Sequence, residues 1–246
     1  MVSSGAIRYS GDFGAGIWRY MDLWKLTSML EERELHLARA VDQSDDQEGR
    51  VSDRTLQGRP ARAEAEARLI TEALGQLMTP EQMMGIYEFS NDLMRNEIML
   101  ISWYIWENES AEMWSAYCLP DDGIAIRSTA GKLIDCLPDL VGDTAVFVGS
   151  VEYVDPNVTD IPEWNAFDPF GYKREQFRHE SELRVMLIDR NANPKGFKIP
   201  IEPESLIEAV YVAPNRSEGH WNNVEAVLRE WSPTLPLRRS ELEVTK

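Results

Sequence analysis

The order of helical and extended patterns is the feature that most constrains the fold of this chain. Residues 145–154, 182–188, 197–201 and 209–212 each have a pattern typical of a strand, and they follow one another late in the chain. Elsewhere, strands and helices do not repeat the regular alternation that produces a doubly wound parallel sheet. The sequence therefore predicts a mixed α+β fold.

The first elements predict a strand, a helix and a second strand, followed by a long loop. Residues 17–21 form a short aromatic strand, the leucines of residues 23–30 recur on one side of a helix, and residues 34–38 alternate again. Residues 41–59 contain almost no apolar side chains. We therefore expect an exposed loop there rather than a core element.

A helical insertion is predicted at about residues 59–96. Within it, Thr79 and Gln82 have the spacing of a capping box, which indicates a fresh helix start. We expect residues 1–16, rich in Gly and Ser, to form a flexible leader. Residues 17–246 then form a single α+β domain that contains the insertion.

The composition disfavours several classes of function. The formal net charge of −17, from 42 acidic and 25 basic residues, opposes bulk binding to polyphosphate, although a local basic cleft is compatible with it. Cys118 and Cys136 lack the spacing of a disulfide framework or a structural zinc site. No apolar run approaches the ~20 residues of a membrane helix. We therefore expect a cytoplasmic protein with no membrane partner.

The segment from Tyr172 to Ile188 gathers ionisable side chains at the start of an apolar strand. They are Lys173, Arg174, His179, Glu180, Glu182 and Arg184. Alternation from Glu180 onward places Glu180, Glu182 and Arg184 on one face of an extended segment. Such a face belongs either to a solvated edge strand or to a cleft, and the pattern alone favours the edge strand. Of the three histidines, only His179 is adjacent to carboxylates.

Two further segments carry side chains that suit a ligand pocket. Trp114 and Tyr117 are one helical turn apart, which is typical of core packing but also suits a pocket that holds a flat ring. Arg127 projects opposite its apolar neighbours, as an anion contact or a surface charge. Arg19 lies beside Tyr20 within an apolar strand, where an arginine either pairs with a carboxylate or contacts a phosphate.

A metal cluster is a further interpretation of the acidic residues. Asp45, Asp46 and Glu48 could supply oxygen ligands together with Glu180 or Glu182, as in a metal-dependent nuclease. The loop around Asp45 is so polar that solvated charge is the better interpretation. The sequence motifs of phosphate loops, dinucleotide folds, serine hydrolases and zincins do not occur.

Three blocks, in this order, resemble the bacterial DUF2971 family. They are IWRYMDLWKLTSMLEERELHLARA with the DDQEG loop, ESAEMWSAYC with DGIAIRS, and YKREQFRHESELRVM. The resemblance covers most of the chain except about residues 59–96. More distantly, the order of these blocks is similar to that of ADP-ribosyltransferase-like folds, especially the branch that modifies nucleic acids in toxin and phage-defence systems. This resemblance implies a mainly antiparallel sheet core with a helical insertion.

The resemblance implies an NAD-dependent enzyme of the glycosyltransferase class that acts on a nucleic acid or a protein in bacterial defence or toxin biology. It assigns the catalytic role to Glu182 or Glu180, with His179 beside them, because a glutamate can orient the ribose and stabilise developing positive charge. It assigns cofactor binding to Arg19, Tyr20, Trp114, Tyr117, Arg127 and Arg184. No metal site is implied, and an inhibitory protein is a further candidate partner.

The chain departs from the patterns of those transferases at two places. It has no histidine on the early strand and no clear Ser-Thr-Ser block. Two alternatives therefore stand beside the transferase: a non-catalytic module that binds a ligand or a partner, and the metal-dependent nuclease. A shared pocket for Arg19, Glu182 and either Trp114 or Tyr117 is what the transferase interpretation requires.

Overall fold

The computed structural model describes residues 11–119, 121–163, 165–214 and 216–242. Its main sheet is antiparallel at every strand pair except β12 with β13. The predicted α+β fold with a mainly antiparallel sheet is confirmed. The strands of this sheet are β1 (Gly16–Asp22), β2 (Glu34–Arg39), β3 (Ile98–Ile105), β4 (Gly123–Thr129), β7 (Phe147–Ser150), β10 (Glu182–Ile188), β11 (Phe197–Pro200), β12 (Ala209–Val212) and β13 (Leu237–Arg239).

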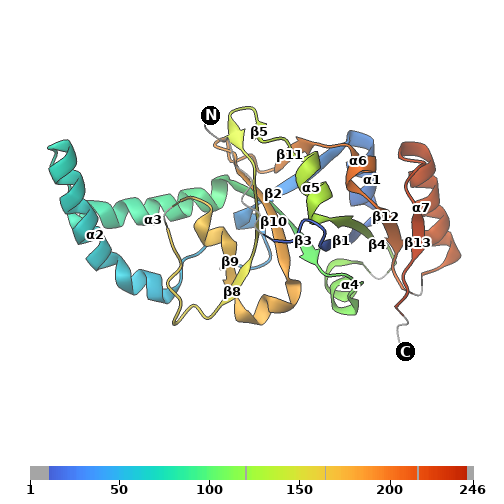
Figure 1. Ribbon diagram of the computed structural model, residues 1–246, viewed down its shortest axis with the longest axis horizontal. Coiled ribbons are helices and arrows are strands. Elements are labelled where there is room, and N and C mark those ends of the chain that lie inside the picture. Colours follow the sequence, from blue (N-terminus) through green and yellow to red (C-terminus); the bar gives the residue numbers. More distant parts are fainter. Residues whose placement is uncertain (1–10, 120, 164, 215, 243–246) are drawn as a thin grey trace.

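Helices cover both faces of the sheet (Figure 1). Along β1, Ile17 and Met21 belong to the main core cluster, whereas Trp18 and Tyr20 pack with Trp114 on the other face. This division follows from the alternation of side chains along a strand. The helices that cover the main cluster are α1 (Leu23–Glu32), α5 (Ala130–Cys136), α6 (Pro203–Leu206) and α7 (Glu218–Trp231), and α4 (Ala111–Tyr117) covers the second.

Short elements complete the body of the fold. Strands β8 and β9 pair in parallel, and β5 pairs with β6. The short elements are η1 (Ala40–Asp42), β5 (Leu140–Val141), β6 (Thr144–Ala145), β8 (Glu152–Val154), η2 (Asp168–Gly171), β9 (Tyr172–Arg174) and η3 (Glu175–Glu180).

The sheet forks at β3. On one edge, β3 pairs with β10 along nearly its whole length. On the other edge, β1 pairs with β3 only at Tyr104 and Ile105, and β2 pairs with it only at Met99 and Leu100. Within the described part of the chain, residues 101–103 have no strand partner on that edge. The strands β1 and β2 therefore diverge beside the middle of β3.

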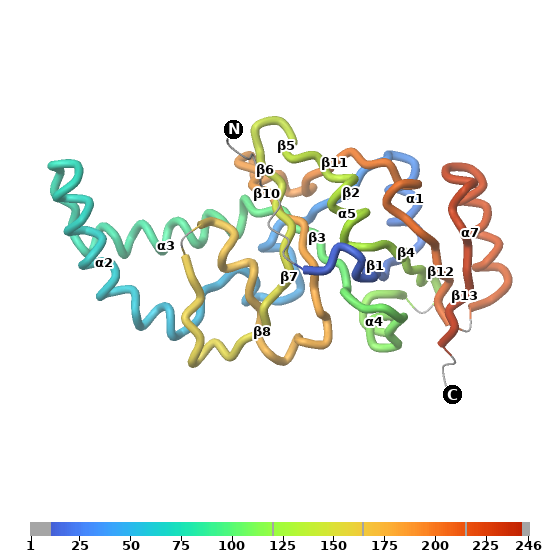
Figure 2. Tube along the Cα trace, in the orientation of Figure 1, coloured from blue at the N-terminus to red at the C-terminus, as the bar shows by residue number. Residues whose placement is uncertain are grey.

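The helical insertion forms an arm of two helices, α2 (Asp53–Leu74) and α3 (Pro80–Glu97). The arm extends away from the sheet, as Figure 2 shows in cyan and green. Its helices pack together through Ala63, Ala67 and Met83. The predicted capping box is confirmed, because Thr79 and Gln82 each accept a hydrogen bond from the backbone N–H of the other.

The expectation that residues 41–59 form an exposed loop is wrong in part, because two carboxylates of this segment are buried. Asp45 is 9% exposed and Glu48 is 3% exposed. They form ion pairs with Arg174 and Arg184, which lie 129 and 136 residues further along the chain. The loop also ends early, since α2 begins at Asp53. Polar composition indicated solvation, but partners from a distant segment compensate the buried charge.

The strand predicted at residues 182–188 is confirmed as β10, but the extended segment does not reach back to Glu180. Glu180 ends the 3-10 turn η3, and Ser181 has a left-handed backbone with φ 37°. Strand β10 lies between β3 and β7 and is buried over six of its seven residues. The interpretation of this segment as a solvated edge strand, which the pattern favoured, is therefore wrong.

We predict that Gly49→Ala lowers the free energy of unfolding by about 2–5 kcal/mol. Gly49 has φ +69°, and a Cβ there would lie 2.0 Å from the Phe170 ring. A left-handed backbone costs roughly 1–2 kcal/mol for a residue with a Cβ, and overpacking a core typically costs about 1–3 kcal/mol more. Urea unfolding measures the loss.

Gly142→Ala is the matched control for this prediction. Gly142 has φ +61°, but a Cβ there meets nothing within 4 Å. Only the backbone cost applies, so we expect a loss of about 1–2 kcal/mol. Equal losses in the two variants would show that the contact with Phe170 does not hold this loop.

Candidate functional site

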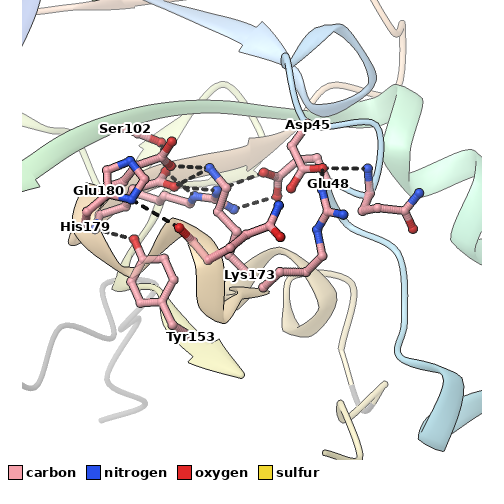
Figure 3. Close-up of polar contacts among 12 residues, drawn as sticks. Asp45, Glu48, Ser102, Tyr153, Lys173, His179 and Glu180 are labelled. Atoms are coloured by element: carbon pink, nitrogen blue, oxygen red, sulfur yellow. Dashed lines mark hydrogen bonds and ion pairs between the residues drawn. The ribbon is translucent and has the colours of Figure 1, made fainter. Parts of the chain in front are cut away.

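A cleft of about 690 Å³ lies at the fork of the sheet. Residues from β1, α1, β2 and β3 line it, and so do Lys173, Glu180, Glu182 and Arg184. The cleft exists because β1 and β2 diverge and leave the middle of β3 uncovered. Figure 3 shows that its charged side chains form a connected network rather than separate surface pairs.

Arg184 is the buried centre of this network. Its side chain is 1% exposed, and its two terminal nitrogens donate to the Glu48 carboxylate at 2.6 and 2.8 Å. Its Nε donates to Glu182 Oε2 at 2.9 Å, and Nη1 also donates to the Phe170 carbonyl at 2.8 Å. Burial lowers the pKa of Arg184, but the charges of Glu48 and Glu182 outweigh it and raise that pKa. The guanidinium is therefore a fixed positive charge.

Glu182 is held ionised. Besides Arg184, it accepts hydrogen bonds from the Ser102 hydroxyl and from Lys173 Nζ, the latter at 2.9 Å. Burial alone raises the pKa of a carboxyl group, but the charges of Arg184 and Lys173 hold the pKa of Glu182 well below its usual range. The backbone N–H of Glu182 donates to Tyr153 Oη at 2.9 Å, which fixes the start of β10. Glu182 is thus positioned but has little capacity to accept a proton.

Glu180 differs from Glu182 in the direction of its pKa shift. Burial is the largest cause of the raised pKa of Glu180, followed by the opposing hydrogen bond from Lys173 Nζ. The Tyr117 hydroxyl donates to Glu180 Oε1 at 3.0 Å. Tyr117 is 43% exposed, so this pair meets the open part of the cleft. A carboxylate with a raised pKa suits proton transfer near neutral pH.

Arg19 supplies a cation to the cleft without an acidic partner. Its Nη1 donates to the Ser102 carbonyl at 2.7 Å, and it forms no ion pair with any described residue. Burial lowers the pKa of Arg19 to about 10, against a smaller opposing effect of Tyr117, so the group is still charged at neutral pH. Arg19 lines the cleft, and a guanidinium in that position attracts an anion strongly.

Six of the site residues predicted from the sequence line one cleft. They are Arg19, Tyr20, Tyr117, Glu180, Glu182 and Arg184. The shared pocket required for Arg19, Tyr117 and Glu182 is therefore present. Trp114, Arg127 and His179 are not among the residues that line it.

These three residues have other surroundings. Trp114 is 6% exposed, packs edge-on against Tyr20 with ring centroids 4.9 Å apart, and donates from Nε1 to Glu109 at 3.0 Å. The Arg127 guanidinium lies over the Trp18 ring, 5.8 Å from its centroid. His179 is exposed on η3, where its Nδ1 lies 3.2 Å from a backbone carbonyl.

Acidic residues proposed as metal ligands are engaged by cations instead. Asp45 pairs with Arg174 at 2.6 Å, and Glu182 pairs with Lys173 and Arg184. Asp46 is exposed. Among the described residues, no group of three or more His, Cys, Asp or Glu side chains is placed to hold a metal ion.

Three residues of the site were not assigned a role from the sequence, and a fourth, Glu48, was considered only as a metal ligand. Lys173 lay within the charged segment, but its bridge between Glu180 and Glu182 depends on β9 lying beside η3. Ser102 and Tyr153 belong to strands whose patterns carried no sign of a site. Glu48 appeared as one carboxylate of a polar loop, and only its distant partner distinguishes it from its neighbours.

Comparisons with known proteins complete the description of the chain. No family model matches it, and no curated protein matches it either. Among solved structures it is similar to Thermus sp. 2.9 DarT in complex with ADP-ribosylated ssDNA, at 10% sequence identity and a TM-score of 0.38, over 95% of this chain and 96% of that chain. The resemblance to the DUF2971 family stays a prediction. In the described residues, no helix combines the length and the apolar character needed to cross a membrane.

We predict that Arg184→Met lowers the free energy of unfolding by more than ~3 kcal/mol, because it leaves Glu48 and Glu182 buried without their cation. The matched control is Arg229→Met. Arg229 is 73% exposed and pairs with the exposed Glu225. Exposed pairs contribute about 0–1 kcal/mol, so we expect a loss below ~1 kcal/mol. Similar losses in urea unfolding would mean that the Arg184 network does not stabilise the cleft.

Proposed function

We propose that the cleft binds NAD and that this chain is an ADP-ribosyltransferase-like enzyme acting on a macromolecule. One observation carries the proposal. The cleft combines Arg19, a cation that forms no ion pair with any described residue, with Glu180, a carboxylate of raised pKa, and the aromatic Tyr117 lines the same space. A cation, a flat ring and a proton acceptor match the pyrophosphate, the nicotinamide and the ribose of NAD. The volume of about 690 Å³ is in the range of small-molecule sites.

Arg19 is the candidate contact for the pyrophosphate. Lys173 and Arg184, the two cations of the buried network, already have carboxylate partners. An added phosphate would compete with those carboxylates but would complete the hydrogen bonding of Arg19. Because Ser102 anchors one nitrogen of the guanidinium, the side chain is already oriented and loses little freedom on binding.

Tyr117 and Tyr20 are the candidate contacts for the flat ring. Both line the cleft, and Tyr117 is the more exposed of the two, at 43% against 7%. Tyr20 is held in place by Trp114 and by the backbone N–H of Ser110, which donates to its hydroxyl at 2.9 Å. We propose that Trp114 supports Tyr20 from behind and does not stack on the flat ring itself.

Glu180 is the candidate proton acceptor, and Glu182 is a positioning residue. In transfer, the bond between the ribose and nicotinamide breaks, and nicotinamide leaves with the electron pair. The acceptor nucleophile forms the new bond to the ribose, and its proton passes to Glu180. Glu182 holds Lys173, which in turn contacts Glu180, so the two carboxylates act through one bridging cation. The charge of Glu182 also stabilises positive charge that develops at the ribose.

We predict that Glu180→Gln lowers the rate of nicotinamide release by about 10²-fold or more, while the affinity for NAD changes only a few-fold. Release from NAD is measured with single-stranded DNA, RNA and protein acceptors in parallel. The raised pKa of Glu180 predicts that the wild-type rate declines in acid from a pH above ~4.3, the ordinary value for a glutamate, as the carboxylate takes up its proton.

Glu175→Gln is the matched control, since Glu175 lies on the same 3-10 turn but its side chain is 58% exposed and points to Arg178. We expect its rate to match the wild type. If the wild type binds NAD but releases no nicotinamide with any acceptor, the chain is a binding module and the transferase proposal fails.

We predict that Arg19→Met weakens NAD binding by ~10-fold or more in calorimetry, because hydrogen bonds from a charged donor contribute about 1.5–3 kcal/mol. Arg33→Met is the control. Arg33 lies outside the cleft lining and pairs with Glu202 and Glu204, so its loss leaves the affinity within about two-fold of wild type. Equal affinity of Arg19→Met and wild type would remove the pyrophosphate assignment.

A further inference from the structure

The outer surface of α3 carries apolar side chains that no other part of the described chain covers. Ile86 is 48% exposed, Phe89 is 69% exposed and Leu93 is 36% exposed. They recur at intervals of three and four residues, which places them on one side of the helix. The side that faces α2 is different and carries Met83. The exposed row therefore does not serve the packing of the arm.

These side chains line a shallow groove, which we call the α3 stripe. It comprises Gln82, Gly85, Ile86, Phe89, Ser90 and Leu93. At Gly85 the space above the helix is open, since a Cβ there would meet nothing within 4 Å. Because the arm stands away from the sheet (Figure 1), a long partner can approach the stripe without meeting the body of the protein.

A row of carboxylates runs along one flank of the α3 stripe. Glu81, Glu88 and Asp92 are all exposed, and their spacing of seven and four residues keeps them on one side of the helix. None of the three forms an ion pair with a described residue. Apolar groups beside such a row of exposed carboxylates are complementary to an apolar surface edged by basic side chains.

We propose that the α3 stripe binds an amphipathic helix of a different protein, one that places a row of Lys or Arg beside its apolar face. Helices commonly recognise apolar grooves through residues spaced by three and four positions. A symmetric antiparallel pair of α3 helices would set the same acidic flank of each copy against the other. The net charge of −17 adds repulsion between copies. The acidic row likewise opposes nucleic acid as the occupant.

The partner site is independent of NAD turnover, so its test uses binding alone. The probe is a synthetic helical peptide with leucines spaced by three and four residues and lysines along one flank. A second peptide has glutamates in place of those lysines. Fluorescence anisotropy with the full chain should show at least ten-fold tighter binding of the lysine peptide, and the preference should shrink as salt is added. Equal binding of the two peptides, or no binding of the lysine peptide, overturns the proposal.

Variants locate the site on the chain. Phe89→Ser should weaken binding of the lysine peptide by ten-fold or more, and the exposed position leaves folding intact, which the melting temperature checks. Leu69→Ser is the control, because Leu69 is 61% exposed on α2 and lies outside the stripe. The double change Glu88→Lys with Asp92→Lys should reverse the preference between the peptides. Unchanged binding by Phe89→Ser overturns the assignment, as does a wild-type dimer that Phe89→Ser dissociates.

Discussion

The cleft depends on the burial of one arginine. The Arg184 guanidinium is removed from water in the middle of a sheet, and an isolated charge there would cost several kcal/mol. Glu182, two residues earlier on the same strand, supplies one compensating charge, and Glu48 supplies the other from the loop before α2. The need to compensate this cation therefore draws an early loop against a late strand. It also keeps Glu182 ionised beside Lys173, which orders the acidic end of the cleft.

The fork of the sheet turns this network into an accessible site. A fully paired β3 would bury its backbone on both edges, but, among the described residues, 101–103 have no strand partner on the edge where β1 and β2 diverge. The Ser102 carbonyl accepts from Arg19 instead, and the Ser102 hydroxyl donates to Glu182. One residue of β3 thus contacts the cationic and the acidic parts of the cleft. Their relative position is set by the strand rather than by a loop, which favours precise geometry.

The helical arm is joined to the cleft through the loop that carries Glu48. From α3, Asn91 donates to the Gly49 carbonyl at 3.1 Å and Arg95 donates to the Glu48 carbonyl at 2.9 Å. Phe170 packs over Gly49 and also accepts from Arg184 through its carbonyl. The inner end of α3 therefore supports the residues that hold Arg184, while its outer surface carries the α3 stripe. The insertion is part of the architecture of the site as well as an addition to the sheet.

Local patterns in the sequence determined the α+β class, the capping box at Thr79 and the apolar character of β10, because helix and strand periods depend on neighbouring residues. They also singled out Arg19, Tyr117, Glu180 and Glu182, since charged or aromatic groups in apolar surroundings are unusual. Only the tertiary structure decided which of the charges are buried. Glu48 has the same local surroundings as its solvated neighbours, and its burial follows from a partner 136 residues away, which no local pattern contains. The left-handed turn at Ser181 likewise sets Glu180 and Glu182 around Lys173, although strand alternation does not extend across it.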